Sequence, residues 1–450
     1  MPIYDPYLIR EATIREPPTH LLGKLKFLGP GFILSASIVG SGELIATTVL
    51  GAQAGFAALW IIIISCLAKV AVQLEFGKHA ILSGETVMSA FTKLPGPMIG
   101  RAHWSVGMVF GALLLKIVQL GGILGGTAMV LHMIYPNFSN GIWATIIAAF
   151  AAALVFNGKY NWIEKSSLIM IGMFTLLTLV ALISLRFTAY HFSLWDVLDG
   201  LQFQLSGEIV AVAIGVFGIT GVASDEIIAY HYWCLEKGYA AYTGPRNETA
   251  AWKVRAKGWI NIMYLDALFA MTIYTFVTVA FYLLGAAVLH KGAIIPQGNQ
   301  VIETLALIYT QSLGAGIKTV YLIGAFFVLF SSVYASLAAW TRVFPDVMGQ
   351  FGWFEFADLA KRKKMVGWLA WIFPTCWAMA YVFIDSPVLM VLSGGIVGSF
   401  LLLLVVFAGL HFKYKVTHFI GSSVFYDVAF WISVLSILFV AVYGLMKVFG

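Results

Sequence analysis

Charged residues are scarce in this 450-residue sequence. Only 11% of the positions are Asp, Glu, Lys or Arg, whereas 60% are hydrophobic. Soluble globular domains carry about 25% charged and about 45–50% apolar residues. A chain this long and this apolar cannot bury its hydrophobic surface in a soluble core, so the composition excludes a disordered chain, a secreted disulfide-rich domain and a cytosolic enzyme. It predicts an all-α polytopic membrane protein.

Cysteine is also scarce, with three residues far apart in the sequence, Cys66, Cys234 and Cys376. An odd and dispersed set predicts neither a disulfide framework nor a zinc site. Gly-x-Ser-x-Gly, His-Glu-x-x-His and the phosphate-binding loop with Lys-Ser or Lys-Thr are missing as well. We therefore expect neither an enzyme nor an ATP-driven pump, and we expect no resident cofactor.

Eleven apolar stretches approach the roughly 20 residues that a helix needs to cross a bilayer. They cover residues 29–52, 56–78, 105–132, 139–157, 164–186, 207–232, 258–288, 316–342, 365–383, 386–411 and 424–446. The polar residues 1–27 precede them and contain no apolar run with a cleavage site, so we expect no signal peptide. The sequence predicts eleven membrane-spanning helices and the lipid bilayer as the main partner.

Lys and Arg are distributed unevenly between the two sides of these spans. With a cytoplasmic N-terminus, 21 of the 27 lie on the inner side, four on the outer side, and Lys69 and Lys116 within spans. Such a bias marks the cytoplasmic side of a membrane protein. We therefore expect a cytoplasmic N-terminus, an extracellular C-terminus and a plasma membrane, in particular a prokaryotic inner membrane. The net charge of 27 − 21 = +6 then needs no nucleic-acid partner.

Two spans share a short pattern. Residues 39–46 read Val-Gly-Ser-Gly-Glu-Leu-Ile-Ala, and residues 222–229 read Val-Ala-Ser-Asp-Glu-Ile-Ile-Ala. The second copy follows five spans later, and an odd number of spans reverses orientation in the membrane. The pattern predicts an inverted repeat with a segment at 1–27, a first repeat at 28–186, a second at 207–412 and an appended span at 424–446.

Both copies contain residues that weaken a helix. Gly40, Ser41 and Gly42 are clustered in span one, and Gly218, Gly221 and Ser224 are clustered in span six. An interior Gly costs a helix about 1 kcal/mol relative to Ala, and Ser competes for backbone hydrogen bonds. We expect both spans to be discontinuous here. Interrupted spans at matching positions of inverted repeats typically hold the substrate site of a transporter.

The same segments carry carboxylates at bilayer depth, which is expensive unless a partner or a polar cavity receives them. The acids are Glu43, Asp225 and Glu226. Main-chain carbonyls freed by unwinding would complete an oxygen-only site, and we expect them at Gly40, Gly221 and Ala223. Such a site suits Mg²⁺, Ca²⁺ or Mn²⁺ rather than a soft metal. In the alternative interpretation, the acids pair with Lys69 or Lys116, or share a proton.

At these residues the chain resembles the SLC11/Nramp transporters, and the likeness covers roughly residues 28–446. It also includes Gly29-Pro30-Gly31-Phe32, close to that family's opening of span one. The resemblance implies an inverted five-plus-five (LeuT/APC-like) fold with an eleventh span. The usual Asp-Pro-Gly-Asn and Met-Pro-His motifs are replaced by Gly40-Ser41-Gly42-Glu43 and Ala223-Ser224-Asp225. This departure is similar to the Nramp-related magnesium transporter branch.

Three further departures bear on mechanism. The family's proton-relay acids in span three match Gln119 and Gly122, which cannot ionise, and a metal-binding glutamine of span ten matches Gly394. The resemblance therefore implies loss of proton coupling. The small residues Gly394 and Ala223 predict a wider cavity, which suits Mg²⁺ because this ion usually keeps several waters.

Together these observations predict a monomeric, uncoupled uptake transporter for Mg²⁺ that also accepts Mn²⁺. The membrane potential would drive alternating access, with spans one, two, six and seven rocking against the rest. Three alternatives remain open: a proton-coupled Mn²⁺ or Fe²⁺ symporter of the usual Nramp type, a sodium-coupled symporter of organic solutes, and a membrane enzyme or non-transporting sensor.

Overall fold

The computed structural model describes residues 5–156, 160–296 and 301–449. Most of the described chain is helical. One short hairpin, β1 (Met98–Ile99) paired antiparallel with β2 (Ala102–His103), lies in the loop after the second span. The α-helical prediction is therefore confirmed.

The first half of the chain contains these helices, with a π-helical stretch η2 inside the first span: α1 (Leu21–Leu25), α2 (Pro30–Ile38), η2 (Val39–Thr47), α3 (Thr48–Ala54), α4 (Leu59–Ala68), α5 (Val70–Ser83), α6 (Val87–Phe91), α7 (Trp104–Leu115), α8 (Ile117–Ile134), α9 (Asn140–Val155), α10 (Tyr160–Ser184) and α11 (Leu194–Asp199).

The second half contains two further π-helical stretches, η5 and η8. Its helices are α12 (Val210–Ile219), α13 (Ser224–Lys237), α14 (Tyr239–Thr243), α15 (Ala250–Leu284), η5 (Gly285–His290), α16 (Val301–Leu313), α17 (Lys318–Gln350), α18 (Leu359–Ile384), α19 (Pro387–His411), η8 (Phe412–Val416) and α20 (Val424–Phe449). Short 3-10 turns lie at Glu11–Thr13, Leu185–Phe187, Gly207–Ile209, Ala315–Ile317 and His418–Ile420.

Among the described residues, nine helices are long and apolar enough to cross a membrane, and the bent pair Pro30–Ile38 and Glu43–Ala54 makes a tenth. The remaining predicted span corresponds to α9, an apolar helix of 16 residues. The count of eleven depends on α9 and stays a prediction, as do the bounds of the two repeats.

Helix ends follow local chemistry. Pro30 begins α2 at the position where its missing N–H costs nothing. The hydroxyls of Ser139 and Thr249 accept from the backbone of the first turns of α9 and α15. Gly84 and Gly238 end α5 and α13 in the left-handed conformation. The residues at these helix ends therefore follow the usual capping preferences.

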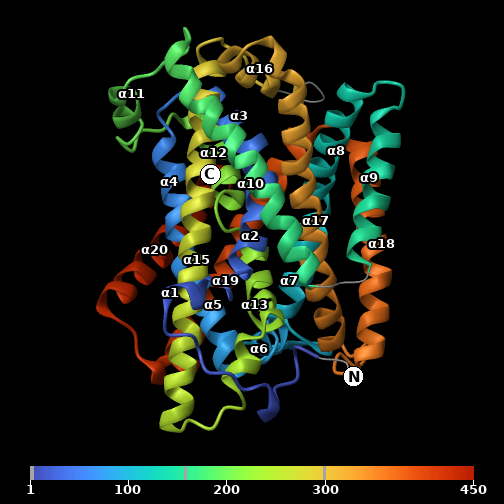
Figure 1. Ribbon diagram of the computed structural model, residues 1–450, viewed down its shortest axis with the longest axis vertical. Helices are drawn as coiled ribbons and strands as arrows, with labels where there is room; N and C mark the ends of the chain where they lie inside the picture. Colours follow the sequence, from blue (N-terminus) through green and yellow to red (C-terminus); the bar gives the residue numbers. More distant parts are fainter. Residues whose placement is uncertain (1–4, 157–159, 297–300, 450) are drawn as a thin grey trace.

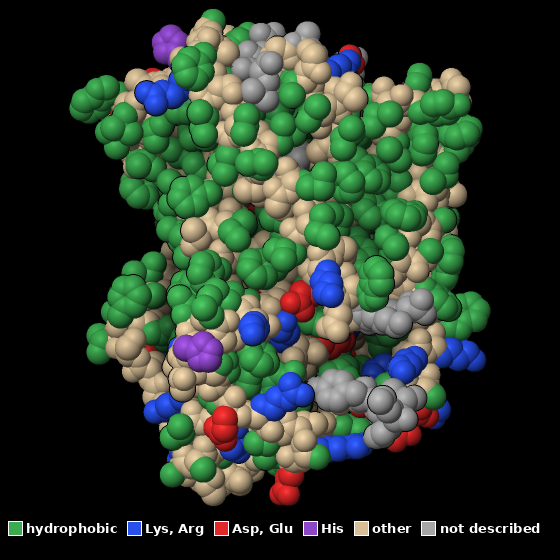
Figure 2. All heavy atoms as spheres, in the orientation of Figure 1, with side chains coloured by type: hydrophobic (Ala, Val, Ile, Leu, Met, Phe, Trp, Pro, Cys, Tyr) green, Lys and Arg blue, Asp and Glu red, His purple; other side chains and the backbone are tan. Residues whose placement is uncertain are grey.

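The broken spans lie inside the bundle. The helices α2, α13 and α19 lie in the middle of the view, α9 and α18 lie along one edge, and α20 lies along the opposite edge (Figure 1). On the face drawn in Figure 2, hydrophobic side chains are spread over the upper and middle parts, and most Lys and Arg side chains lie toward the lower end. Both views fit a membrane protein with one strongly basic end.

Candidate functional site

Span six is interrupted between α12 and α13. The helix α12 ends at Ile219, residues 220–223 are not helical, and α13 begins at Ser224. Gly221 has φ +62°, a conformation that L side chains rarely adopt. A Cβ at this position would also lie 2.8 Å from the Cα of Cys66 in α4. Gly221 is therefore the residue that permits the break.

Span one is interrupted in a different way from span six. It bends by 43° between Pro30–Ile38 and Glu43–Ala54, but the backbone between them stays helical with the wider π-type turn of η2. The predicted discontinuity of span one is therefore present as a bend at residues 39–42, where the backbone of Gly40, Ser41 and Gly42 is π-helical. The side chain of Ser41 and the surroundings of Gly42 lie outside the described part of the structure.

Packing against α17 accounts for the helical backbone of span one at its bend. A Cβ at Gly40 would overlap the Val328 carbonyl oxygen, so this glycine allows span one and α17 to approach each other closely. The hydroxyls of Ser331 and Ser332 in α17 donate to the Ala36 carbonyl at 3.0 and 3.2 Å. Neighbouring side chains thus satisfy backbone groups that a bend frees.

Glu43 connects the two spans. Its side chain is fully buried, and Oε1 accepts the N–H of Gly221 at 3.0 Å. The other oxygen, Oε2, is buried without a hydrogen-bond partner among the described residues. An unpaired carboxylate oxygen in a buried position costs several kcal/mol unless a cation or proton approaches it. The carboxylate therefore has one anchored oxygen and one oxygen available to a ligand.

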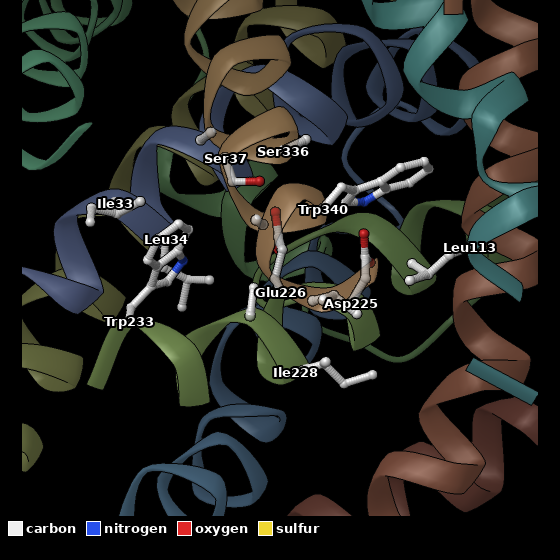
Figure 3. Close-up of a pocket in the computed structure, with 14 residues that line it drawn as sticks. Ile33, Leu34, Ser37, Leu113, Asp225, Glu226, Ile228, Trp233, Ser336 and Trp340 are labelled. Carbon is white, nitrogen blue, oxygen red and sulfur yellow. The ribbon is translucent and has the colours of Figure 1, made fainter. Parts of the chain in front are cut away.

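Asp225 and Glu226, at the start of α13, face a small cavity between α2, α13 and α17 (Figure 3). Its volume of about 20 Å³ holds roughly one water. Oε2 of Glu226 accepts the backbone N–H of Ala223 at 2.8 Å, so this side chain caps α13. Asp225 forms an ion pair with Lys116, which is buried between α7 and α8.

Lys69 lies between α4 and α5 and is fully buried. Its ammonium donates to the carbonyls of Phe217 at 2.6 Å and Thr220 at 2.5 Å. These carbonyls belong to the last turn of α12 and to the break that follows it, where the helix dipole favours a cation. Lys69 therefore stabilises the free end of the half-helix rather than pairing with the site acids.

The three acids are not gathered into one site. Over the described ranges, no group of three or more His, Cys, Asp or Glu side chains lies close enough to hold a metal ion. One buried lysine, Lys116, also offsets the negative charge of Asp225. The expected anionic site of Glu43, Asp225 and Glu226 therefore stays a prediction, since the described residues show the acids apart. The sequence left Lys69 and Lys116 as possible partners of the acids, and in the structure Lys116 forms an ion pair with Asp225.

Several buried oxygens around the break have no hydrogen-bond partner among the described residues. They are Glu43 Oε2, Thr220 Oγ1, Ser224 Oγ and Gln119 Oε1. Buried polar groups in native proteins are nearly always paired, so such a group needs an explanation. Thr220 was not singled out from the sequence, because a lone threonine in an apolar run usually bonds its own helix.

The predicted widening at Gly394 is also absent. A Cβ at Gly394 in α19 would overlap the side chain of Gln119 in α8, so Gln119 already fills that space. Gly122, one turn further along α8, packs against α19, where a Cβ would lie 2.9 Å from the Pro387 carbonyl oxygen. The two positions matched to the proton relay thus serve contact between α8 and α19, and neither side chain ionises.

An interrupted span inside a bundle of apolar helices, with buried carboxylates and oxygens at the interruption, defines a membrane transporter rather than an enzyme. The family profile described as Nramp, Natural resistance-associated macrophage protein-like, matches residues 31–447. The chain therefore belongs to the Nramp family, and the resemblance inferred from the sequence is confirmed at the level of the family.

Individual relatives are distant. A protein named divalent metal cation transporter MntH, from Aeromonas hydrophila, is 22% identical over 304 residues, which are 66% of this chain and 68% of that protein. The manganese transporter of Eremococcus coleocola superposes with a TM-score of 0.58 at 14% identity over 97% of each chain. MhsT in complex with L-phenylalanine gives a TM-score of 0.60 at 15% identity, covering 97% of this chain and 100% of MhsT. These structures confirm the LeuT-like fold.

Proposed function

We propose that the chain is an uptake transporter for divalent cations, with Mg²⁺ as the main substrate and Mn²⁺ as a second one. The observation that carries the proposal is the set of unpartnered buried oxygens at the break of span six, above all Oε2 of Glu43. Hard oxygen ligands favour Mg²⁺ and Mn²⁺ over softer metals. The name of the Aeromonas relative, a divalent metal cation transporter, supports the same class of substrate.

In the proposed site, Glu43, Asp225 and Glu226 bind the ion partly through water. The carbonyls of Gly221 and Ala223 complete the shell, although that of Ala223 already accepts the Ile227 N–H at 2.9 Å. Gly40 was expected to contribute a carbonyl, but it lies within the helical stretch η2. We therefore leave it out of the proposed ligand set. The site must close around the ion, because the three acids are separate in this conformation.

Lys116 gives the empty site a counter-charge. Its ammonium neutralises Asp225, which limits the cost of a buried carboxylate when no ion is bound. Cation binding then exchanges the ammonium for the ion, and release restores the pair. Because the Lys116 ammonium competes for Asp225, the cation binds less tightly and is released more readily in each transport cycle.

The proposed transport is not coupled to protons. Gln119 and Gly122 stand where the relay acids would be, and neither titrates. Two positive charges moving through 100 mV release about 4.6 kcal/mol, twice the roughly 2.3 kcal/mol per charge. The proposal includes a plasma-membrane location, a cytoplasmic N-terminus, an extracellular C-terminus and a monomeric unit. The basic lower end in Figure 2 then faces the cytoplasm.

Uptake by purified protein in liposomes tests the substrate class. We expect Mg²⁺ and Mn²⁺ to accumulate and to compete with each other, and L-phenylalanine to have no effect. Uptake of L-phenylalanine without uptake of either cation would contradict the proposal and indicate a symporter of organic solutes. Uptake of Mn²⁺ without any Mg²⁺ would contradict the assignment of the main substrate.

A further inference from the structure

A second and much larger cavity lies at the basic end of the molecule. It has a volume of about 1720 Å³ and opens between the start of α10, the last turn of α13, the inner part of α17 and the start of α18. We call it the basic vestibule and define it by Lys26, Lys165, Arg342, Lys363 and Lys364. It is distinct from the small cavity at Asp225 and Glu226.

The vestibule has an excess of positive charge. Among the residues that the structure describes, eight basic residues and one acidic residue, Glu236, line it. Three of the eight pair with carboxylates: Arg342 with Glu236 at 3.0 Å, Arg362 with Asp5 at 2.7 Å, and Lys237 with Glu164 at 2.8 Å. The other five have no acidic partner within the described ranges, and they are Arg15, Lys26, Lys165, Lys363 and Lys364.

Exposed indole rings line the same cavity. Trp162 at the start of α10 is 72% exposed, and Trp368 and Trp371 in α18 are 61% and 46% exposed. Exposed Trp in a membrane protein marks the level of the lipid headgroups. The unpaired lysines 363 and 364 lie about one turn from Trp368 on the same helix. We therefore infer that Lys363 and Lys364 lie near the level of the lipid phosphate groups.

We propose that the basic vestibule binds phosphate groups, either of an anionic phospholipid headgroup or of a free polyphosphate. Basic pockets between transmembrane helices on the cytoplasmic side are a recurrent way of holding such headgroups. The exposed indoles favour the lipid, because they give the acyl-chain side of the pocket an amphipathic rim. These lysines could simply reflect the excess of positive charge on the inner side of a membrane protein. That bias alone does not explain why they line one large cavity.

The vestibule lies directly beyond the small cavity. Trp233 lines the small cavity, and the guanidinium of Arg342, which lines the vestibule, lies 5.3 Å from the Trp233 ring. A cation leaving Asp225 and Glu226 along α13 would thus meet five uncompensated positive charges. A bound phosphate group would lower that barrier. This consequence for cation release rests on the proposed function, whereas binding itself does not.

Native mass spectrometry of the purified full chain tests the binding. The probes are phosphatidylglycerol, phosphatidylcholine and inorganic pyrophosphate, each added to the lipid-free protein in detergent. The test variant is Lys363→Ala/Lys364→Ala. The matched control is Lys257→Ala/Lys415→Ala, which also removes two exposed basic-end lysines but leaves the vestibule lining intact.

We expect phosphatidylglycerol to bind the wild type and the control alike, and to bind the test variant at least about tenfold more weakly. Phosphatidylcholine should bind all three weakly. Comparable binding of pyrophosphate, lost in the test variant, would identify a free polyphosphate as the ligand. Equal binding of both anions by the test variant and the control would overturn the proposal. None of these binding measurements requires transport. If the uptake assay failed, the proposed function would fall, but the measured phosphate binding would still test the vestibule.

Discussion

Span one and span six carry nearly the same pattern, yet their backbones differ. Span six opens into two half-helices at Gly221, which has φ +62°. Span one bends by 43° but remains helical through the π-type stretch η2. Each contributes a buried glutamate, Glu43 from span one and Glu226 from span six. The same local sequence therefore does not impose the same backbone.

The neighbours of each segment account for the difference. Gly40 packs against the backbone of α17, and a helical backbone is what fits that contact. Gly221 instead meets α4, where Lys69 holds the carbonyls left by the break. Glu226 caps the half-helix that follows. An open break thus requires partners for its backbone groups, and in span six Lys69 and Glu226 provide them.

Glu43→Gln should have the largest effect, because it removes the one carboxylate that joins the two spans. We expect Mg²⁺ uptake to fall about tenfold to hundredfold, corresponding to roughly 1.5–3 kcal/mol. Glu208→Gln, at an exposed position before α12, is the control and should transport normally. Wild-type uptake by Glu43→Gln would remove span one from the site.

Gly40→Ala tests the packing role assigned to span one. Its new Cβ would overlap the Val328 carbonyl, and overpacking of this kind costs about 1–3 kcal/mol. We expect a lower thermal midpoint in detergent, with unchanged Mg²⁺ affinity of the protein that folds. Gly172→Ala, where a Cβ meets open space, should leave the midpoint unchanged or raise it. A selective loss of affinity would instead return Gly40 to the ligand set.

Gly221→Ala tests the break in span six. The left-handed backbone costs an alanine about 1–2 kcal/mol, and the shift should displace the N–H that holds Glu43. We expect weaker Mg²⁺ binding by calorimetry together with a modest loss of stability. Gly100→Ala is the control for strain alone, because Gly100 has φ +64° and open space around it. If both variants bind Mg²⁺ equally well, the break does not shape the site.

Lys116→Met should have the smallest effect, and in the opposite direction. Without its ammonium, Asp225 no longer has a competing partner, so we expect cation binding to become about fivefold tighter, or ~1 kcal/mol. Lys69→Met should weaken binding, because it leaves the carbonyls of Phe217 and Thr220 unpaired. Weaker binding by Lys116→Met would mean that Lys116 positions Asp225 for the ion.

The sequence was sufficient for the class of fold and for the location of the interruptions. Hydropathy located each long helix, but α15, α17 and α18 continue several residues past the predicted spans. Helical hydrogen bonds do not end where the apolar residues end, so hydropathy cannot locate these termini.

The details of the site were harder to predict, because they depend on contacts between distant segments. The fit of Gln119 against Gly394 and the pairing of Lys116 with Asp225 join helices that are far apart in the sequence. A short pattern also cannot distinguish an unwound segment from a π-helical one, because neighbouring helices decide which backbone groups find partners.

Mg²⁺ flux into proteoliposomes under a potassium-set potential, with a pH-sensitive dye inside, tests the central claim most directly. An uncoupled transporter with no ionisable side chain at positions 119 and 122 predicts Mg²⁺ entry that follows the potential without any change of internal pH. Entry of Mn²⁺ with internal acidification, and no entry of Mg²⁺, would contradict the account and show a proton-coupled metal symporter.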